Sequence, residues 1–282
     1  KYFKTDMVYV AKSGFWLSLG QVLAVIFTFT LSIFFANTIS KEVYGNYKFI
    51  LSVTGILGAL SLTGMGTVVV QAVARGAEGV LKEAVKTSLK WSVLMIGTAI
   101  GLSIYYFLNG NNTLAIAMLV AGVALPLTNS FGLYGGYFSG KKDFRRGTMY
   151  WAISQGLLTL GLIIAGTLTH DVLTLIIVYF TITTGTTLYA YIHTTSKYHL
   201  NDIRDNSLVT YGKHLSLMGL FGTLANQLDK ILVFHYLGAI ELAVYSFSQA
   251  IPEQIKGSFK NLFNVALPKY ASLPEKELRA SV

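Results

Sequence analysis

Long apolar stretches alternate with short polar segments along almost the whole chain. A helix that crosses the hydrocarbon core of a bilayer needs about 20 mostly apolar residues. Backbone groups in lipid must be satisfied within the span, and the stretches show no period-two alternation of a barrel strand, so we expect helices. The expected spans cover residues 14–36, 47–70, 91–108, 113–134, 148–168, 172–192, 214–236 and 243–267. The pattern predicts an all-α, polytopic membrane helix bundle with about eight transmembrane helices.

Lysine and arginine residues collect in every second loop between these spans. Cytoplasmic loops of membrane proteins carry the excess of basic residues, and this excess sets the orientation. The basic residues of one side are Lys1, Lys4, Lys12, Arg75, Lys82, Lys86, Lys90, Lys141, Lys142, Arg145, Arg146, Lys197, Arg204, Lys213, Lys256, Lys260, Lys269, Lys276 and Arg279. The other side carries Lys41 and Lys48, and Lys230 lies within the seventh span. We therefore expect a multi-pass protein of the cytoplasmic membrane with a cytoplasmic N-terminus.

The composition agrees with a membrane protein and narrows the chemistry. Hydrophobic residues make up 53% of the 282 residues and charged residues 12%, whereas an average soluble domain has roughly 25% charged residues. The formal net charge of +9 is spread over loops rather than gathered in a basic helix, so we expect no nucleic acid partner. The chain has no cysteine, which excludes thiol nucleophiles and thiolate metal sites. Because the sequence shows no nucleophile elbow, paired carboxylates or metal-binding histidine spacing, we expect neither an enzyme nor a cofactor.

A short internal similarity suggests two lobes. After the first span the chain reads SKEVYGNYKF, and after the seventh it reads GAIELAVYSF. A shift of 198 residues aligns Tyr47 with Tyr245 and Phe49 with Phe247. Six helices fill this period with their orientation preserved, as in transporters built from parallel repeats. We therefore expect a six-helix lobe over residues 1–206 and the first two helices of a second, truncated lobe over 207–282.

Polar residues interrupt the seventh span. Asn226, Gln227, Asp229 and Lys230 gather there among apolar residues. Charged groups inside a membrane cost a few kcal/mol or more, so they usually face a bundle interior or a watery cavity. Adjacent helical residues project about 100° apart, so Asp229 and Lys230 cannot neutralise each other on one face, and at least one needs a partner on another helix. Two interpretations stay open: a transport pathway, or a structural ion pair with a Lys230 that reaches the interface.

Three more polar residues lie at the predicted cytoplasmic ends of spans. Gln71 and Arg75 end the second span, and Lys256 lies in the eighth. They are candidates for a basic vestibule that receives an anionic head group. The excess of basic residues in cytoplasmic loops accounts equally for both cationic residues.

Two segments carry a family resemblance. NTISKEVYGNYKFI and LANQLDKILVFHYLGAIELAVYSFSQAIP resemble the polysaccharide biosynthesis family of lipid-linked oligosaccharide flippases, the Wzx-type members of the multidrug/oligosaccharidyl-lipid/polysaccharide exporter superfamily. The resemblance implies two six-helix lobes that work by alternating access, of which this chain is an N-terminal part. The implied substrate is a glycan repeat unit on a polyprenyl pyrophosphate, turned from the cytoplasmic to the outer leaflet. By the same resemblance, Gln227, Asp229 and Lys230 match the polar positions of the family's seventh helix.

Such a substrate suits the charge pattern, since a pyrophosphate head needs a hydrated, cationic cavity while its tail stays in lipid. The expected partners are this lipid-linked oligosaccharide and membrane lipids, with a polysaccharide polymerase and glycosyltransferases as candidates. Two other classes stay open. An essential intramembrane acid would favour a cation-coupled multidrug exporter of the same superfamily. A membrane glycan ligase or acyltransferase would require a large outside loop or a catalytic histidine and acid.

Overall fold

The computed structural model describes residues 7–198, 200–203 and 206–271, with side chains described over 13–198, 200–203 and 210–255. The described residues form ten helices joined by short links, and no strand occurs among them. The helices are α1 (Met7–Thr38), α2 (Lys41–Ala59), α3 (Met65–Ala74), α4 (Val80–Leu108), α5 (Asn112–Phe131), α6 (Tyr134–Gly140), α7 (Phe144–Leu168), α8 (Val172–Lys197), α9 (Asn206–Leu237) and α10 (Ala239–Ala271). The predicted all-α bundle is confirmed.

The predicted span 47–70 is not one helix. α2 ends at Ala59 and α3 begins at Met65. At the break, the Gly64 N–H donates a hydrogen bond to the Ser216 hydroxyl of α9 (2.9 Å). A buried helix end needs partners outside its own ladder, and α9 supplies one. The single-helix prediction was wrong because apolar composition reports nothing about a partner on a distant helix.

A second break lies at the end of the predicted span 113–134, which α5 otherwise fills. α5 ends at Phe131, and α6 begins at Tyr134 and ends at Gly140. A Cβ atom at Gly140 would lie 2.8 Å from the Val70 carbonyl oxygen of α3. The missing side chain thus lets α3 and α6 pack backbone against backbone, as small residues do at membrane helix contacts. The two short helices α3 and α6 form one packed pair.

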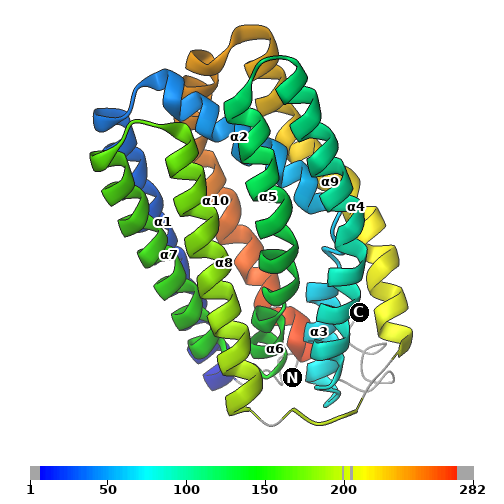
Figure 1. Ribbon diagram of the computed structural model, residues 1–282. Coiled ribbons are helices and arrows are strands. Elements are labelled where there is room, and N and C mark those ends of the chain that lie inside the picture. The colour runs from blue at the N-terminus through cyan, green and yellow to red at the C-terminus, as the bar shows by residue number, and fades with distance from the viewer. Residues whose placement is uncertain (1–6, 199, 204–205, 272–282) are drawn as a thin grey trace.

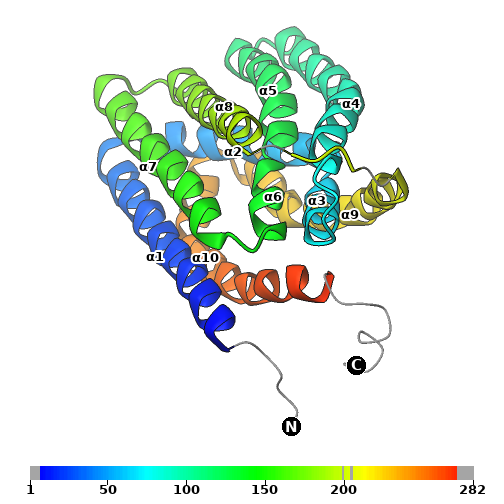
Figure 2. The same ribbon diagram turned by 90° about the horizontal axis from the view of Figure 1, so that it is seen from below.

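The long helices form a bundle in which many neighbours in space are far apart in sequence (Figure 1). α4 packs against α5, α5 against α8, α8 against α7, and α7 against α1. α10 packs against α1 and α2, whereas α9 packs against α2 and α3. Seen from below, α2 runs between the row made by α4, α5, α8 and α7 and the pair α9 and α10 (Figure 2). α2 is therefore the helix that joins the two groups.

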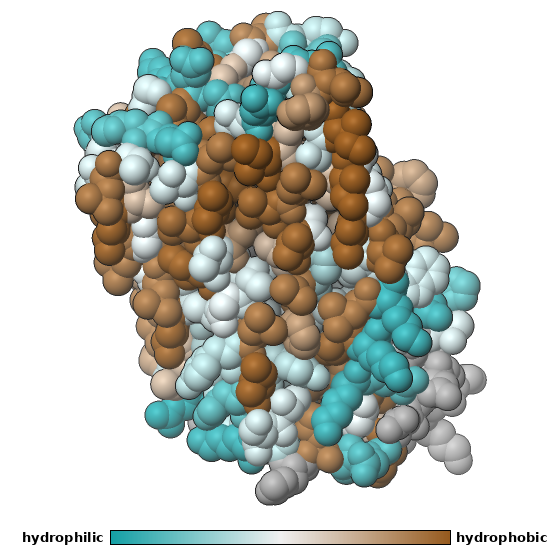
Figure 3. All heavy atoms as spheres, viewed as in Figure 1, coloured by the Kyte–Doolittle hydropathy of each residue, from teal (hydrophilic) through white to brown (hydrophobic). Residues whose placement is uncertain are grey.

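The bundle has two ends of different chemistry. The turns at residues 75–79 and 141–143 lie at the lower end of Figure 1, which we call the basic end. The turns at residues 39–40, 109–111 and 169–171 lie at the other end, which we call the opposite end. Hydrophobic residues form a band between these ends on the face that Figure 3 shows. A band of this kind is what a bilayer core requires of a protein surface.

Five helical stretches within the described residues are long and apolar enough to cross a membrane. They are Ser13–Thr38, Val80–Leu108, Asn112–Gly140, Phe144–Leu168 and Val172–Lys197. They coincide with five of the eight predicted spans. The span 47–70 is divided between α2 and α3, and the more polar α9 and α10 do not reach the same apolarity. The proposed internal repeat stays a prediction.

α2, α9 and α10 meet at the opposite end through aromatic rings. The rings of Tyr44 and Phe247 are stacked with centroids 4.3 Å apart, and those of Phe49 and Phe234 are stacked at 3.8 Å. We call these four residues the aromatic seam. Beside it, a Cβ atom at Gly45 would lie 1.8 Å from a carbonyl oxygen of α10. The seam is therefore a close contact without room for another side chain.

Candidate functional site

The two charged residues of α9 both find partners on α10. Lys230 Nζ lies 2.8 Å from Glu253 Oε1, and the Lys230 side chain is 17% exposed whereas that of Glu253 is 54% exposed. The carboxylate of Asp229 accepts a hydrogen bond from the Tyr245 hydroxyl. It also accepts one from the backbone N–H of Lys230 (2.8 Å). The prediction that at least one of the two charges needs a partner on another helix is confirmed.

A third charged helix position belongs to this site. The sequence interpretation placed Lys48 at the edge of the span 47–70 and on the side opposite the basic loops but gave it no role, and in the structure it lies in the second turn of α2 and is half-buried. The helix begins at Lys41 because the Ser40 hydroxyl caps it, accepting a bond from the Val43 N–H (3.3 Å). Lys48 Nζ lies 5.4 Å from the centre of the Tyr44 ring. This cap starts the helix earlier than apolarity alone indicates.

Lys48, Lys230 and Glu253 form one electrostatic group across three helices. Lys48 interacts electrostatically with both Lys230 and Glu253. Glu253 pairs with Lys230, and its charge also offsets the repulsion between Lys230 and Lys48. The group lies where α2, α9 and α10 meet, next to the aromatic seam.

Lys48 also lines a cavity on the other side of α2 from α9. This cavity has a volume of about 210 Å³ and lies between α1, α2, α7 and α8. Its lining is Ala24, Phe27, Thr28, Leu31, Ser32, Phe35, Tyr44, Tyr47, Lys48, Leu51, Trp151, Gln155, Leu158, Thr159, Leu162 and Tyr179. Among these described residues Lys48 is the one charged side chain. We call this space the Lys48 cavity.

Gln227 lies at a different, neutral cavity. A space of about 630 Å³ lies next to the break between α2 and α3 and is lined by Gln227 together with residues of α5 such as Thr128 and Asn129. The Asn129 amide donates a hydrogen bond to the Ser61 hydroxyl (3.2 Å). Gly55 lets Gln227 approach α2, since a Cβ atom there would lie 3.0 Å from Gln227 Nε2. Gln227 is therefore separated from the charged group.

Three more of the predicted site residues, Asn226, Gln71 and Arg75, line neither the Lys48 cavity nor the cavity at Gln227. Asn226 is exposed, and its amide donates to the Gly222 carbonyl one turn back (2.7 Å). Arg75 is the exposed C-terminal cap of α3, and its backbone N–H bonds to the Gln71 carbonyl (3.2 Å). Lys256 belongs to α10, but its side chain lies outside the described residues. Because the Lys256 side chain is outside the described residues, the vestibule of Gln71, Arg75 and Lys256 stays a prediction.

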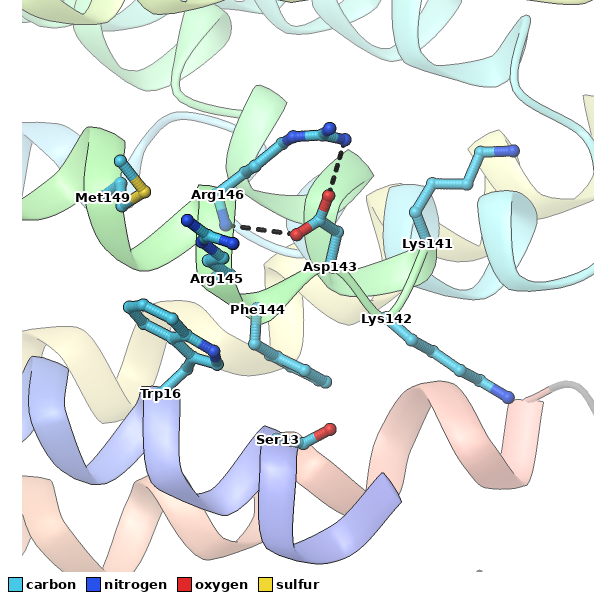
Figure 4. A pocket seen from close by; sticks show the side chains of 9 residues that line it. All are labelled: Ser13, Trp16, Lys141, Lys142, Asp143, Phe144, Arg145, Arg146 and Met149. Atoms are coloured by element: carbon cyan, nitrogen blue, oxygen red, sulfur yellow. Dashed lines mark hydrogen bonds and ion pairs between the residues drawn. The ribbon is translucent and has the colours of Figure 1, made fainter. Parts of the chain in front are cut away.

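The basic cavity that the structure does contain is built from other residues. A cavity of about 810 Å³ at the basic end is lined by Ser13, Trp16, Lys141, Lys142, Asp143, Phe144, Arg145, Arg146 and Met149 (Figure 4). Sequence reasoning used its four cationic residues only to orient the chain. Their density, four basic residues within six positions, was the available signal.

Polar residues of α1 and α10 meet between the basic cavity and the Lys48 cavity. The Gln21 amide donates to the backbone carbonyl (3.1 Å) and to the side-chain oxygen (3.3 Å) of Gln254. The Gln254 amide in turn donates to the Thr28 hydroxyl (3.0 Å). Sequence reasoning missed this contact, although Gln21 is a polar residue within the first apolar span. The three side chains hold α1 against α10.

Comparisons with known proteins agree with this architecture. Residues 10–273 match the family described as polysaccharide biosynthesis protein. The MATE multidrug transporter DinF-BH, solved with a bound ligand, is similar with a TM-score of 0.77 at 9% identity, and the match covers 100% of this chain and 69% of that one. A MOP superfamily transporter from Pyrococcus furiosus, titled as having a binding pocket of reverse polarity, gives 0.69 at 16% identity and covers 97% and 67%. A MATE solved in complex with Br-NRF gives 0.66 at 15% identity and covers 97% and 69%.

No curated protein sequence matches the chain. At identities this low the solved structures show the shared fold and say nothing about what this chain carries. Together with the five membrane-capable helical stretches, the comparisons make the chain a multi-pass membrane protein.

Proposed function

The chain belongs to the polysaccharide biosynthesis protein family, and on that premise we propose that it moves a polyprenyl-pyrophosphate-linked oligosaccharide across the cytoplasmic membrane by alternating access. The substrate would be a surface polysaccharide repeat unit, which glycosyltransferases supply and a polymerase consumes. The N-terminus lies in the cytoplasm in this proposal, because the basic end then faces the cytoplasm. No bond of the substrate changes, so the proposed role is transport and not catalysis.

The observation that carries this proposal is the charge of the Lys48 cavity. Its lining combines one ammonium group with hydroxyl and amide groups and with the flat faces of Trp151, Tyr44 and Tyr47. An ammonium group in a cavity without a lining carboxylate attracts an anionic group, and the neighbouring Lys230 adds to this field. Hydroxyl and amide groups offer the hydrogen bonds that a sugar needs when it leaves water. An anionic glycolipid head matches both features.

The arrangement of contacts supports a moving barrier. The aromatic seam closes the opposite end between α2, α9 and α10, whereas the cavity lined by Lys141, Lys142, Arg145 and Arg146 lies at the basic end. Alternating access requires one end to close while the other is accessible. Aromatic contacts and hydrogen bonds at the seam are few and directional, so a rigid-body movement of α9 and α10 away from α2 can break them together.

Cation-coupled export of organic cations is the second candidate, and one observation favours it. Asp229 and Glu253 place two carboxylates within α9 and α10, in contact with Tyr245 and Lys230. Carboxylates inside the membrane region are typical of proton or ion relays. In that case Asp229 would carry the coupling ion.

The first test is made in the host that carries the gene. After its deletion we expect a polyprenyl-linked oligosaccharide to accumulate while the surface polymer disappears, measured by lipid extraction and mass spectrometry. The wild-type gene should reverse both effects. Lys48→Gln should restore at most about a fifth of the flux, since loss of one close charge is worth about 1 kcal/mol or more. Lys41→Gln is the matched control, because Lys41 starts the same helix and is exposed.

Unchanged glycolipid and polymer in the deletion strain would overturn the flippase proposal. Loss of resistance to cationic drugs, reproduced by Asp229→Asn, would instead establish the exporter. Exchanging the two charges of the Lys230–Glu253 pair tests whether Lys230 has a structural or a transport role. The double variant, Lys230→Glu with Glu253→Lys, is compared with each single variant. If it restores thermal stability but not transport, Lys230 acts on the substrate; if it restores both, the pair is structural.

The orientation has its own test, which the cysteine-free sequence makes clean. Lys82→Cys lies near the basic end and His170→Cys in the turn 169–171 at the opposite end, and both parent side chains are at least partly exposed. In intact cells a membrane-impermeant thiol reagent should label His170→Cys and spare Lys82→Cys. The reverse pattern would contradict the proposed cytoplasmic N-terminus.

A further inference from the structure

The basic cavity at the start of α7 is the strongest site outside the charged group of α2, α9 and α10. We infer that it is a docking site for the phosphate head group of a membrane lipid. The site itself stands on its own geometry, whereas the identification of that lipid with the transported one rests on the proposed function. The inference rests on the charge of the cavity, the backbone conformation of Lys142, the apolar part of the lining and the place of the cavity along α1.

The charge of the cavity favours an anion. Its lining contributes four cationic side chains, Lys141, Lys142, Arg145 and Arg146, and one carboxylate, Asp143. Asp143 pairs with Arg146 (2.8 Å), and Glu78 from outside the lining pairs with Lys141. Counting both acids, the group keeps a formal excess of two positive charges. Basic pockets between transmembrane helices on the cytoplasmic side bind lipid head groups by this means.

The backbone at Lys142 supports a functional role. Its φ is +60°, and within the described residues it is the one non-glycine residue with positive φ. This conformation costs a lysine roughly 1 kcal/mol or more relative to glycine, which adopts it freely. The turn is closed by hydrogen bonds from the Lys142 N–H to Ser139 (3.0 Å) and from the Asp143 N–H to Phe138 (2.9 Å). A lysine at a position made for glycine indicates that the side chain has a use.

The two sides of the cavity differ as the two parts of a lipid differ. The Arg145 guanidinium lies 5.5 Å from the centre of the Trp16 ring, and Phe144 and Met149 add apolar surface beside it (Figure 4). Lys142 extends from the turn in a direction away from Lys141 (Figure 4). A tryptophan near a span end is typical of the membrane interface. A cationic rim over an apolar floor fits an amphiphile better than a free phosphate ion.

The cavity also lies at the beginning of a row of spaces along α1. A second cavity of about 430 Å³ shares Phe144 with it and extends along α1 to Gln21. That second cavity shares Trp151 with the Lys48 cavity. The row thus begins at the cationic side chains of the basic cavity and ends at the half-buried Lys48. A head group bound at the basic end is placed at the entrance of the row.

The test measures lipid proximity at Trp16 in the purified full chain. The background is Trp91→Phe with Trp151→Phe, so that Trp16 alone fluoresces. In phosphatidylcholine nanodiscs that contain brominated phosphatidylglycerol, we expect stronger quenching than with the same amount of brominated phosphatidylcholine. Lys142→Gln with Arg145→Gln should weaken the lipid's apparent affinity on the order of tenfold or more, because each basic group near a lipid phosphate contributes about 1 kcal/mol.

Two variants separate binding from folding. Lys82→Gln with Lys86→Gln removes two basic groups of α4 outside the cavity lining and should leave the quenching unchanged. Lys142→Gly removes the charge and relieves the positive φ, so we expect weaker lipid binding at a thermal stability no lower than that of the parent. Equal quenching by both brominated lipids, or an equal loss in the α4 control, would overturn the site.

Competition identifies the source of the phosphate. Farnesyl diphosphate and unbrominated phosphatidylglycerol are each used to displace the brominated phosphatidylglycerol. If farnesyl diphosphate does so at a far lower concentration, the site serves the polyprenyl substrate. If the two are equally potent, the site binds anionic lipids in general. Displacement by inorganic diphosphate as strong as that by farnesyl diphosphate would overturn a lipid site. Selective lipid binding in a protein whose deletion leaves glycolipid and polymer unchanged would reject the proposed function and leave the docking site standing.

Discussion

The two ends of the bundle differ in how their helices meet. At the opposite end, α2, α9 and α10 touch through stacked rings and a glycine contact without room for a side chain. At the basic end, α1, the turn 141–143 and the start of α7 enclose an open cavity of about 810 Å³. The difference shows that helices α2, α9 and α10 pack closely at the opposite end, whereas an open cavity lies at the basic end; under the proposed function we expect the barrier at the opposite end.

The contact of α2 with α9 and α10 also differs from the contact between α4 and α5. α4 and α5 pack through small and flexible apolar residues, with Gly122 so close to Ala99 that their Cβ atoms would be 2.9 Å apart. Such packing is continuous and has no alternative partners. The seam depends on a few rings and one shared carboxylate. We therefore expect the seam to open while the α4–α5 contact stays intact.

The largest effect should come from filling the glycine contact at the seam. Gly45→Leu would drive a side chain into the backbone of α10, because even a Cβ atom would lie 1.8 Å from the Ala239 carbonyl oxygen. We expect a loss of about 3 kcal/mol in the free energy of unfolding, or separation of α10 from α2. Thermal unfolding in nanodiscs measures the loss. Gly97→Leu is the control, since nothing lies within 4 Å of a Cβ there; equal destabilisation by both variants would contradict a uniquely close seam.

The next effect concerns the carboxylate shared by two lysines. Glu253→Lys would place a third cation beside Lys48 and Lys230. Because Glu253 is half-exposed, we expect a loss of about 1 to 2 kcal/mol rather than the cost of a fully buried charge. Glu253→Gln should lose about half as much. A stability that falls with added salt in the parent but not in Glu253→Gln would confirm that the contact is electrostatic.

Much of this fold was readable in the sequence, and the reasons are physical. Apolar length placed the helices α1, α4, α5, α7 and α8, because lipid demands long uninterrupted apolarity. It failed at 47–70, where the turn inside the expected span is stabilised by a contact with another helix. Hydropathy describes one helix at a time, whereas that break depends on two.

The site was readable in part for the same reason. A charge inside an apolar span is a local signal, so Asp229 and Lys230 were found. Their partners Tyr245 and Glu253 lie on another helix, and no spacing along the chain indicates them. The role of Lys48 was missed because a lysine at the edge of an expected span was counted only among the basic residues of the opposite side. The cap at Ser40 starts α2 at Lys41, so Lys48 lies in its second turn.

A smaller effect tests the rings of the seam themselves. Phe49 and Phe234 are stacked with centroids 3.8 Å apart. A double-mutant cycle with Phe49→Leu and Phe234→Leu should give a coupling of about 0.5 to 1.5 kcal/mol, the usual contribution of an aromatic pair beyond its buried area. Phe49→Leu with Leu228→Ala is the comparison cycle, since Leu228 is an exposed residue of α9. A coupling near zero for the aromatic pair would mean that burial alone holds this contact.

The smallest expected effect on stability concerns the contact between Gln21 of α1 and Gln254 of α10. Gln21→Leu removes the two hydrogen bonds from α1 to Gln254, which should cost about 1 kcal/mol or less. Its effect on access should be larger than its effect on stability, because these bonds separate the cavity that reaches Gln21 from the Lys48 cavity. Ala24→Cys, in the lining of the Lys48 cavity, provides the probe position in the cysteine-free chain.

In vesicles whose basic end faces the reagent, we expect Ala24→Cys to react several-fold faster when Gln21→Leu is also present. Gln155→Leu is the matched control, because Gln155 lines the same cavity from α7. An unchanged reaction rate with Gln21→Leu would show that the barrier begins elsewhere, and the seam would then be the first closed contact. A faster rate in both variants would mean that polarity of the cavity, rather than the α1–α10 contact, controls entry. A faster rate in Gln21→Leu alone would show that the Gln21–Gln254 contact limits access from the basic end to the Lys48 cavity.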